Sequence, residues 1–177
     1  MILRPFLANT RATASVEFAL LVPLLIILLF GGTEAGHFVW SQHKLAEAVR
    51  DGARYAARLP IDKVCNETVD LLDKNNPSTE YDQVVLITRT GQLDDAAARP
   101  VVPGWTDAQV VVEVDCDSDS FVDTGIYKEL GFRGPVVTVR AVEVTYPSMF
   151  NGLGVLDGGL SRSVKLNAVS HAAVIGI

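Results

Sequence analysis

The sequence lacks the motifs by which most enzymes and metal proteins are recognised. It contains no nucleophile elbow, no phosphate-binding loop with its lysine, and no ligand pairs at zinc spacing. His43 and His171 stand alone, as structural histidines commonly do. We therefore expect a protein that is not an enzyme and that carries no cofactor.

A surplus of basic residues is also missing beyond the N-terminal part of the chain. From Leu59 to the C-terminus there are nine Lys and Arg against 17 Asp and Glu, a net charge of −8. Nucleic acid binding needs a basic face to meet the phosphates. The acidic balance therefore argues against nucleic acid as a partner.

Cysteine is scarce, with only Cys65 and Cys116, and neither has a C-x-x-C partner. Two cysteines allow a single intramolecular pairing. A disulfide is favoured if this part of the chain lies outside the cytoplasm. A pair of buried free thiols is the alternative.

Charge is absent from one long stretch near the N-terminus. Between Glu17 and Glu34 the residues read FALLVPLLIILLFGGT, without a charged side chain. The apolar stretch of residues 14–32 approaches the roughly 20 residues needed to cross a bilayer, and a backbone in lipid must be helical. Pro23 removes one helical donor and is expected to kink or loosen the helix. We expect this segment to lie in membrane lipid.

Three kinds of N-terminal signal are compatible with this segment: a cleaved secretory signal, an ordinary signal anchor, and a pilin-type signal whose short basic leader is removed. Glu17 bears on the choice, because an acid at the edge of an apolar run is costly without a partner. A cut near residue 12 would create an α-ammonium a little over one helical turn from Glu17. A solvated carboxylate at the membrane interface is the alternative.

The helix is expected to continue beyond the apolar stretch, over His37–Arg58, and to end at Pro60. One face of this segment is apolar or small, at helical spacing, and the opposite face is charged. The residues of the apolar face are Phe38, Leu45, Ala48, Val49, Gly52, Ala53, Ala56 and Leu59. Arg4 and Arg11 favour a cytoplasmic N-terminus. The sequence thus predicts one long helix whose first half lies in lipid and whose second half packs on a domain.

The remainder of the chain predicts an α+β domain with an antiparallel sheet. Ile61–Asn75 has the apolar spacing of a second, shorter helix. Four later segments have the composition or alternation of strands: Gln83–Thr90, Gln109–Cys116, Val136–Tyr146 and Ser161–Ile175. The long helix is expected to cover one face of this sheet.

An acidic cluster after the second predicted strand resembles part of a calcium-binding loop. Its carboxylates are Asp115, Asp117, Asp119 and Asp123. However, Ser120 stands where such a loop needs glycine, and Ile126 where it needs a bidentate glutamate. A solvated acidic loop is the simpler interpretation. One functional hypothesis, alternative to the one that the family resemblance described below implies, is a membrane-anchored periplasmic module that binds a ligand or a surface through this loop.

Two further patterns lie at the outer end of the apolar stretch. Glu34-x-x-His37 has the spacing of one di-iron ligand pair, but the second pair and the additional glutamates that such a site needs are not visible. Gly32-x-x-x-Gly36 would let another helix approach closely, although chance and flexibility at the membrane exit explain it as well.

Several motifs together resemble one known family. They are Arg11-Ala-Thr-Ala-Ser-Val-Glu17-Phe18, the apolar run with Pro23, Gly31-Gly-x-Glu34-x-Gly36, and Ala48-x-x-x-x-Ala53-Arg54-Tyr55-Ala56-Ala57. In this order they resemble the TadE-like family, minor pilin-like proteins of the tight adherence (Tad/Flp) pilus. The resemblance covers about residues 11–58 and is weaker over Val136–Val174.

The resemblance implies cleavage by a prepilin peptidase between Ala12 and Thr13. The family commonly has glycine where this chain has Ala12, and such peptidases prefer a small residue. Glu17 and Phe18 are then the residues of processing and assembly, with Glu17 paired to the new ammonium of its own chain or of a neighbouring subunit.

The resemblance also implies a pilin-like organisation with an inner-membrane anchor and a periplasmic domain. The subunit would initiate, prime or cap a pilus, with other minor and major pilins and the inner-membrane platform as partners. The segments predicted are a leader at 1–12, a transmembrane helix at 13–36, its periplasmic continuation at 37–59 and a periplasmic α+β domain at 60–177.

Overall fold

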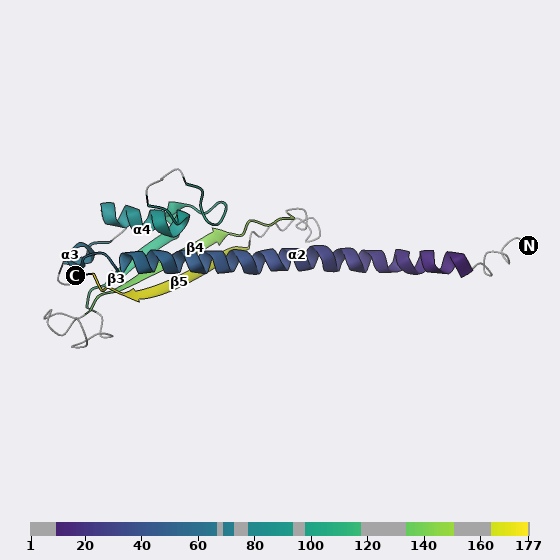
Figure 1. The fold of residues 1–177 in the computed structure, drawn as a ribbon, viewed down its shortest axis with the longest axis horizontal. Coiled ribbons are helices and arrows are strands. Elements are labelled where there is room, and N and C mark those ends of the chain that lie inside the picture. The colour runs from purple at the N-terminus through teal and green to yellow at the C-terminus, as the bar shows by residue number, and fades with distance from the viewer. Residues whose placement is uncertain are drawn as a thin grey trace, which may run out of the picture. The chain divides into compact units, whose positions relative to one another are not determined.

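The chain is described by a computed structural model over residues 10–66, 69–72, 78–93, 98–117, 134–150 and 164–176 (Figure 1). It divides into two compact units. Unit 1 comprises Met1–Val39 and Ser148–Gly159, and unit 2 comprises Trp40–Pro147 and Leu160–Ile177. The long helix α2 (Thr10–Ala56) contributes residues to both units.

Helix α2 is the longest element and continues through Pro23. In unit 1 its large apolar side chains from Val16 to Phe30 are exposed, except for the half-buried Val22. By length and composition α2 is able to cross a membrane. The predicted single helix, running from the apolar stretch into the amphipathic segment, is confirmed.

The second part of α2 belongs to the core of unit 2. The predicted apolar face is buried at helical spacing from Leu45 to Ala56, with Ala48, Val49 and Ala53 between them. Phe38, predicted on the same face, is exposed instead. After Ala56 the chain makes two tighter turns, and Pro60, which has no N–H to donate, follows the end of the helix.

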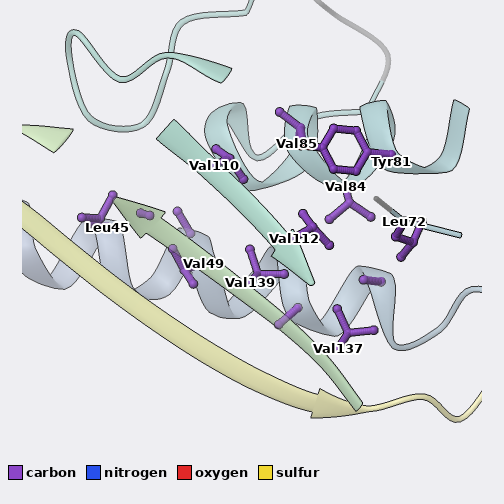
Figure 2. Close-up of a cluster of buried hydrophobic side chains, with 14 of the residues drawn as sticks. Leu45, Val49, Leu72, Tyr81, Val84, Val85, Val110, Val112, Val137 and Val139 are labelled. Carbon is purple, nitrogen blue, oxygen red and sulfur yellow. The ribbon is translucent and has the colours of Figure 1, made fainter. Parts of the chain in front are cut away.

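A three-stranded antiparallel sheet forms the second layer of unit 2. Its order is β3 (Val110–Asp115), β4 (Val136–Thr145) and β5 (Lys165–Ala173). Alternate residues of each strand enter one buried cluster, in which Val110 and Val112 of β3 lie near Val137 and Val139 of β4 (Figure 2). Three of the four predicted strands and the α+β fold class are therefore confirmed.

The fourth predicted strand is wrong, because Gln83–Thr90 lies in helix α4 (Thr79–Thr90). Ser78 is the N-cap, with its hydroxyl accepting from the Tyr81 N–H at 3.1 Å. Gly91 ends the helix in a left-handed conformation, with a φ of 74°. Tyr81, Val84, Val85 and Thr88 are buried at helical spacing, and Thr90 at the end of the helix is buried too.

The second predicted helix, Ile61–Asn75, is also wrong over residues 65–66 and 69–72, while its residues 67–68 and 73–75 lie outside the described residues. Helix α3 covers only Ile61–Val64, and a short antiparallel hairpin follows, formed by β1 (Cys65–Asn66) and β2 (Val69–Asp70). A 3-10 turn, η1 (Asp107–Gln109), precedes β3. The hairpin brings Cys65 and Asp70 opposite each other, and both bind the end of β3 as described below.

Helices α2 and α4 approach each other closely at Gly52. A Cβ atom at this position would overlap the Thr88 hydroxyl, which instead donates to the Val84 carbonyl at 2.6 Å. One turn away, the Tyr55 hydroxyl donates to the Gln83 side-chain oxygen at 2.8 Å. The two helices thus cover the same face of the sheet, and Gly52 provides the room for their contact.

Candidate functional site

The part of α2 in unit 1 carries the predicted processing and assembly residues. Ala12 and Thr13 lie in the first turn of the helix backbone. Glu17 is exposed, and Phe18 is 64% exposed. A chain beginning at Thr13 would carry its α-ammonium about 6 Å along the helix axis from Glu17. This spacing lets the carboxylate pair with the ammonium of its own chain or with that of another.

The small residues further along α2 leave an open surface. A Cβ atom added at Gly32 or Gly36 would meet no atom within 4 Å outside the helix's own backbone. The two positions are one turn apart on the same face. Another helix would find no side chain to displace there, and the packing role of this pair stays a prediction.

Near the same end of the apolar stretch, unit 1 contains a contact that the sequence did not predict. Phe30 and Phe150 meet edge to face, with ring centroids 5.0 Å apart and planes at 85°. The Glu34 carboxylate accepts from the backbone N–H groups of Met149, at 3.2 Å, and Phe150, at 3.4 Å. Residues 148–150 are thus held on α2 by the ring pair at Phe30 and by the Glu34 carboxylate, which lies one helical turn after Phe30.

The Glu34-x-x-His37 pair does not gain further ligands in the described residues. No group of three or more His, Cys, Asp or Glu side chains suited to a metal occurs among them. The Glu34 carboxylate accepts hydrogen bonds from the backbone of residues 149 and 150. This contact accounts for an acidic residue at the end of the apolar stretch.

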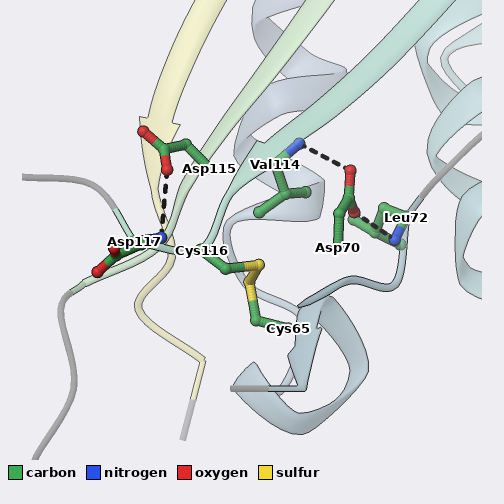
Figure 3. Close-up of a disulfide and its surroundings, with 7 residues drawn as sticks. All are labelled: Cys65, Asp70, Leu72, Val114, Asp115, Cys116 and Asp117. Carbon is green, nitrogen blue, oxygen red and sulfur yellow. Dashed lines mark hydrogen bonds between the residues drawn. A yellow bond between two sulfur atoms is a disulfide. The ribbon is translucent and has the colours of Figure 1, made fainter. Parts of the chain in front are cut away.

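The predicted disulfide between Cys65 and Cys116 is present in unit 2, with a Cα–Cα distance of 5.9 Å (Figure 3). It joins the start of the β1–β2 hairpin to the end of β3. Asp70 makes a second link between the same elements, because its carboxylate accepts from the Leu72 N–H at 2.7 Å and from the Val114 N–H at 3.1 Å. Together they fix the hairpin to the outer edge of the sheet.

The acidic cluster is only partly described. Asp115 accepts from the Asp117 N–H at 3.2 Å, which forms a local turn directly after β3 (Figure 3). Asp119 and Asp123 lie outside the described residues. The calcium prediction therefore stays a prediction, and the described half of the cluster has the geometry of a strand-ending turn.

The exposed face of the sheet carries polar cross-strand pairs beside apolar side chains such as Val169. Arg140 of β4 lies 2.9 Å from Glu113 of β3, and Thr138 lies 2.9 Å from His171 of β5. His43, predicted to be structural, is exposed on α2. These contacts are cross-strand pairs of the kind that stabilise sheets.

A comparison with protein families finds a match to the N-terminal part of the chain. The family model described as TadE-like protein matches residues 12–54. The matched segment lies entirely within α2, and it confirms the resemblance noted in the sequence. No curated protein and no solved structure matches the chain. The match associates the chain with the Tad pilus.

Proposed function

We propose, from the TadE-like match of residues 12–54, that the chain is a minor pilin-like structural subunit of a Tad/Flp pilus. The subunit is not an enzyme. It is anchored in the inner membrane by α2 and assembles by helix–helix packing along that helix. Its task is to initiate, prime or cap the pilus that serves adherence and biofilm formation.

The observation that carries this proposal is the coincidence of the family match with α2. The match ends two residues before the helix does. It therefore includes both the exposed apolar surface of unit 1 and the segment buried in unit 2. The first part of this helix exposes apolar side chains, and its last part belongs to a folded core. Such a helix is suited to hold the folded domain on a membrane or on a bundle of like helices.

The proposed processing step removes a leader that ends at Ala12 and makes Thr13 the new N-terminus. The new ammonium then balances Glu17, which otherwise brings an unpaired carboxylate to the edge of an apolar run. The substrate of the prepilin peptidase is thus the chain itself. Neighbouring pilins and the membrane platform are the partners that the assembled helix meets.

The proposed orientation places unit 2 in the periplasm. Arg4 and Arg11 favour a cytoplasmic N-terminus. A disulfide between Cys65 and Cys116 supports an oxidising compartment for the domain that contains it. Protease added to intact spheroplasts is expected to digest unit 2 and to leave a fragment that contains the apolar stretch. Digestion only after lysis would contradict this orientation.

Mass spectrometry of the protein purified from the membrane fraction tests the processing step. We expect a mature chain that begins at Thr13. The matched control is a variant with Ala12→Leu, which puts a bulky residue before the cut and is expected to keep the full-length N-terminus. An intact N-terminus in the unaltered protein, or a cut after the apolar stretch, would overturn the pilin-like assignment.

Assembly is tested by Glu17→Ala in the pilus-producing cell. Because Glu17 has a pairing role in the proposal, the variant is expected to insert into the membrane but to be lost from crosslinked complexes with pilus components. Glu47→Ala is the matched control, since Glu47 is an exposed acid on the same helix. Equal recovery of both variants in those complexes would refute the role of Glu17.

A further inference from the structure

We propose that residues 148–150 form a second membrane contact, in which Met149 and Phe150 enter the outer boundary of the lipid beside α2. The partner is the phospholipid surface, at the level where headgroups meet acyl chains. This inference rests on the proposed membrane anchoring of α2, and it concerns a segment that begins more than 90 residues after the end of that helix in the sequence.

The position of the segment on α2 is the first argument. Phe150 packs against Phe30, a residue of the uncharged stretch, and the two backbone N–H groups of residues 149 and 150 bind Glu34, the first charge after that stretch. Phe30 lies about 6 Å along the helix axis from Glu34. If Glu34 marks the membrane surface, the ring pair lies at the depth of about 5–10 Å that interfacial apolar side chains reach.

The chemistry of the exposed atoms is the second argument. Met149 is 56% exposed, and Phe30 is also exposed, although both are apolar. Their neighbours on α2, Leu29 and Ile26, are exposed as well. Met149 is therefore an exposed apolar side chain in a segment bound to α2 at Phe30 and Glu34, so lipid that covers the exposed apolar side chains of α2 at this level is expected to meet residue 149 too.

The hydrogen bonds at Glu34 remove the main cost of such an insertion. An irregular segment near lipid is unfavourable because each unpaired N–H costs several kcal/mol there. Glu34 accepts from two of these groups, and the same bonds satisfy a carboxylate at the edge of the apolar stretch. The hydrogen bonds thus lower the cost of placing both the two N–H groups and the Glu34 carboxylate at this depth.

The test uses the full-length protein in vesicles of phosphatidylcholine and phosphatidylglycerol. A Met149→Cys variant is labelled with an environment-sensitive fluorophore, while Cys65 and Cys116 stay in their disulfide. Leu29→Cys on the apolar stretch is the lipid-exposed control, and Val169→Cys on the outer face of the sheet is the aqueous control, since both native side chains are exposed. Brominated lipid reports contact with acyl chains, and iodide reports contact with water.

We expect the probe at 149 to lose about as much emission to brominated lipid as the probe at 29, and to be blue-shifted from the probe at 169. Quenching at 29 with only iodide quenching at 149 would overturn this inference and leave the anchoring intact. Protection of 149 from both quenchers would indicate a protein partner and would also overturn it. Absence of lipid quenching at 29 would overturn the anchoring and the inference together.

A second variant tests the role of Glu34. Glu34→Ala removes the acceptor of both N–H groups and is expected to shift the probe at 149 toward the iodide-quenched state, with the probe at 29 unchanged. Glu47→Ala, placed on α2 in unit 2, should change neither probe. An unchanged probe at 149 in Glu34→Ala would show that the carboxylate does not hold the segment.

Discussion

At the scale of single residues, the contact between α2 and α4 depends on the absence of a side chain at Gly52. Glycine is a poor helix former, with a cost of about 1 kcal/mol relative to alanine. Here that cost is offset by the close approach of Thr88, which would otherwise meet a Cβ atom. Gly36, in the same helix, has open space instead.

Gly52→Ala is expected to lower the stability of unit 2 by about 1–3 kcal/mol, because a methyl group is forced into a packed contact. The measurement is chemical unfolding of the full chain in detergent micelles, followed by tryptophan fluorescence. Gly36→Ala is the matched control and should be neutral or slightly stabilising, since alanine favours the helix and meets nothing. A stabilising Gly52→Ala would contradict the proposed contact.

Tyr55 predicts how stability changes at high pH. Burial, and secondly the negative charge of Glu80, raise the pKa of its hydroxyl above the ordinary value of about 10. The unfolded chain then loses this proton before the folded chain does. The contribution of Tyr55 to stability is therefore complete below the unfolded pKa and is lost as pH rises through the folded pKa.

The free energy of unfolding of the full chain is measured between neutral pH and about pH 11. It should fall more steeply with rising pH in the native chain than in a Tyr55→Phe variant. Phenylalanine also removes the bond to Gln83, so only the slope with pH, and not the level, is compared. Parallel pH curves for the two proteins would contradict a raised pKa.

At the scale of elements, α4 shows where sequence patterns mislead. Gln83–Thr90 is rich in β-branched residues, which favour strands. The helix depends on signals outside that segment, namely the Ser78 N-cap, the acids Glu80 and Asp82 in the first turn, and the Gly91 C-cap. A window that began at Ser78 would have shown Tyr81, Val84, Val85 and Thr88 at helical spacing.

The short helix α3 shows a different limit. Its sequence continues with helical apolar spacing, but Cys65 is bonded to Cys116 and Asp70 binds Val114. These partners lie 51 and 44 residues away, and no local pattern identifies the second of them. Tertiary bonds thus override the helical preference of a short segment.

A bulge in β4 gives a prediction at this scale. The register with β5 shifts between Ala141 and Val144, and Glu143 there has a φ of 55°. Its N–H donates to the Asn167 side chain at 2.9 Å, and its carbonyl accepts from Gln109 at 2.8 Å. Only the backbone of Glu143 takes part in these bonds, in a conformation that costs an L-residue roughly 1–2 kcal/mol.

Glu143→Gly is therefore expected to stabilise the protein by up to about 1 kcal/mol, after the greater freedom of glycine in the unfolded chain is subtracted. Glu143→Ala keeps the strain and removes the same side chain, so it should be close to neutral. Both variants are compared by urea unfolding in micelles. Equal effects of glycine and alanine would mean that the left-handed conformation does not limit stability.

At the scale of the whole molecule, the disulfide closes a loop of 51 residues, from the hairpin to the end of β3. Such a loop restricts the unfolded chain by about 4 kcal/mol in the chain-entropy model. A variant with both Cys65→Ser and Cys116→Ser should lose stability of that order, measured as its unfolding midpoint. Reductant should lower the midpoint of the native chain and leave the double variant unchanged. A native midpoint that does not respond to full reduction would contradict a stabilising role.

The candidate site was predictable where its determinants are local. The apolar stretch, Glu17 and the small residues are read directly from residues 12–36, and two cysteines permit only one pairing. The contact of Glu34 with residues 149 and 150 was not predictable, because it joins positions 115 and 116 residues apart through backbone donors that every residue type possesses.

The core of unit 2 is formed by α2 together with strands that come much later in the sequence, and this has a consequence for the chain while it is being synthesised. Leu45 and Val49 belong to the same buried cluster as Val137 and Val139 of β4. About 80 residues separate the end of α2 from the start of β4, and a ribosome adding 5–20 residues per second takes roughly 4–16 s to make them. During that interval the apolar face of the helix is already made and the strands β4 and β5 do not yet exist, so a nascent chain has a window of seconds in which a chaperone can bind there.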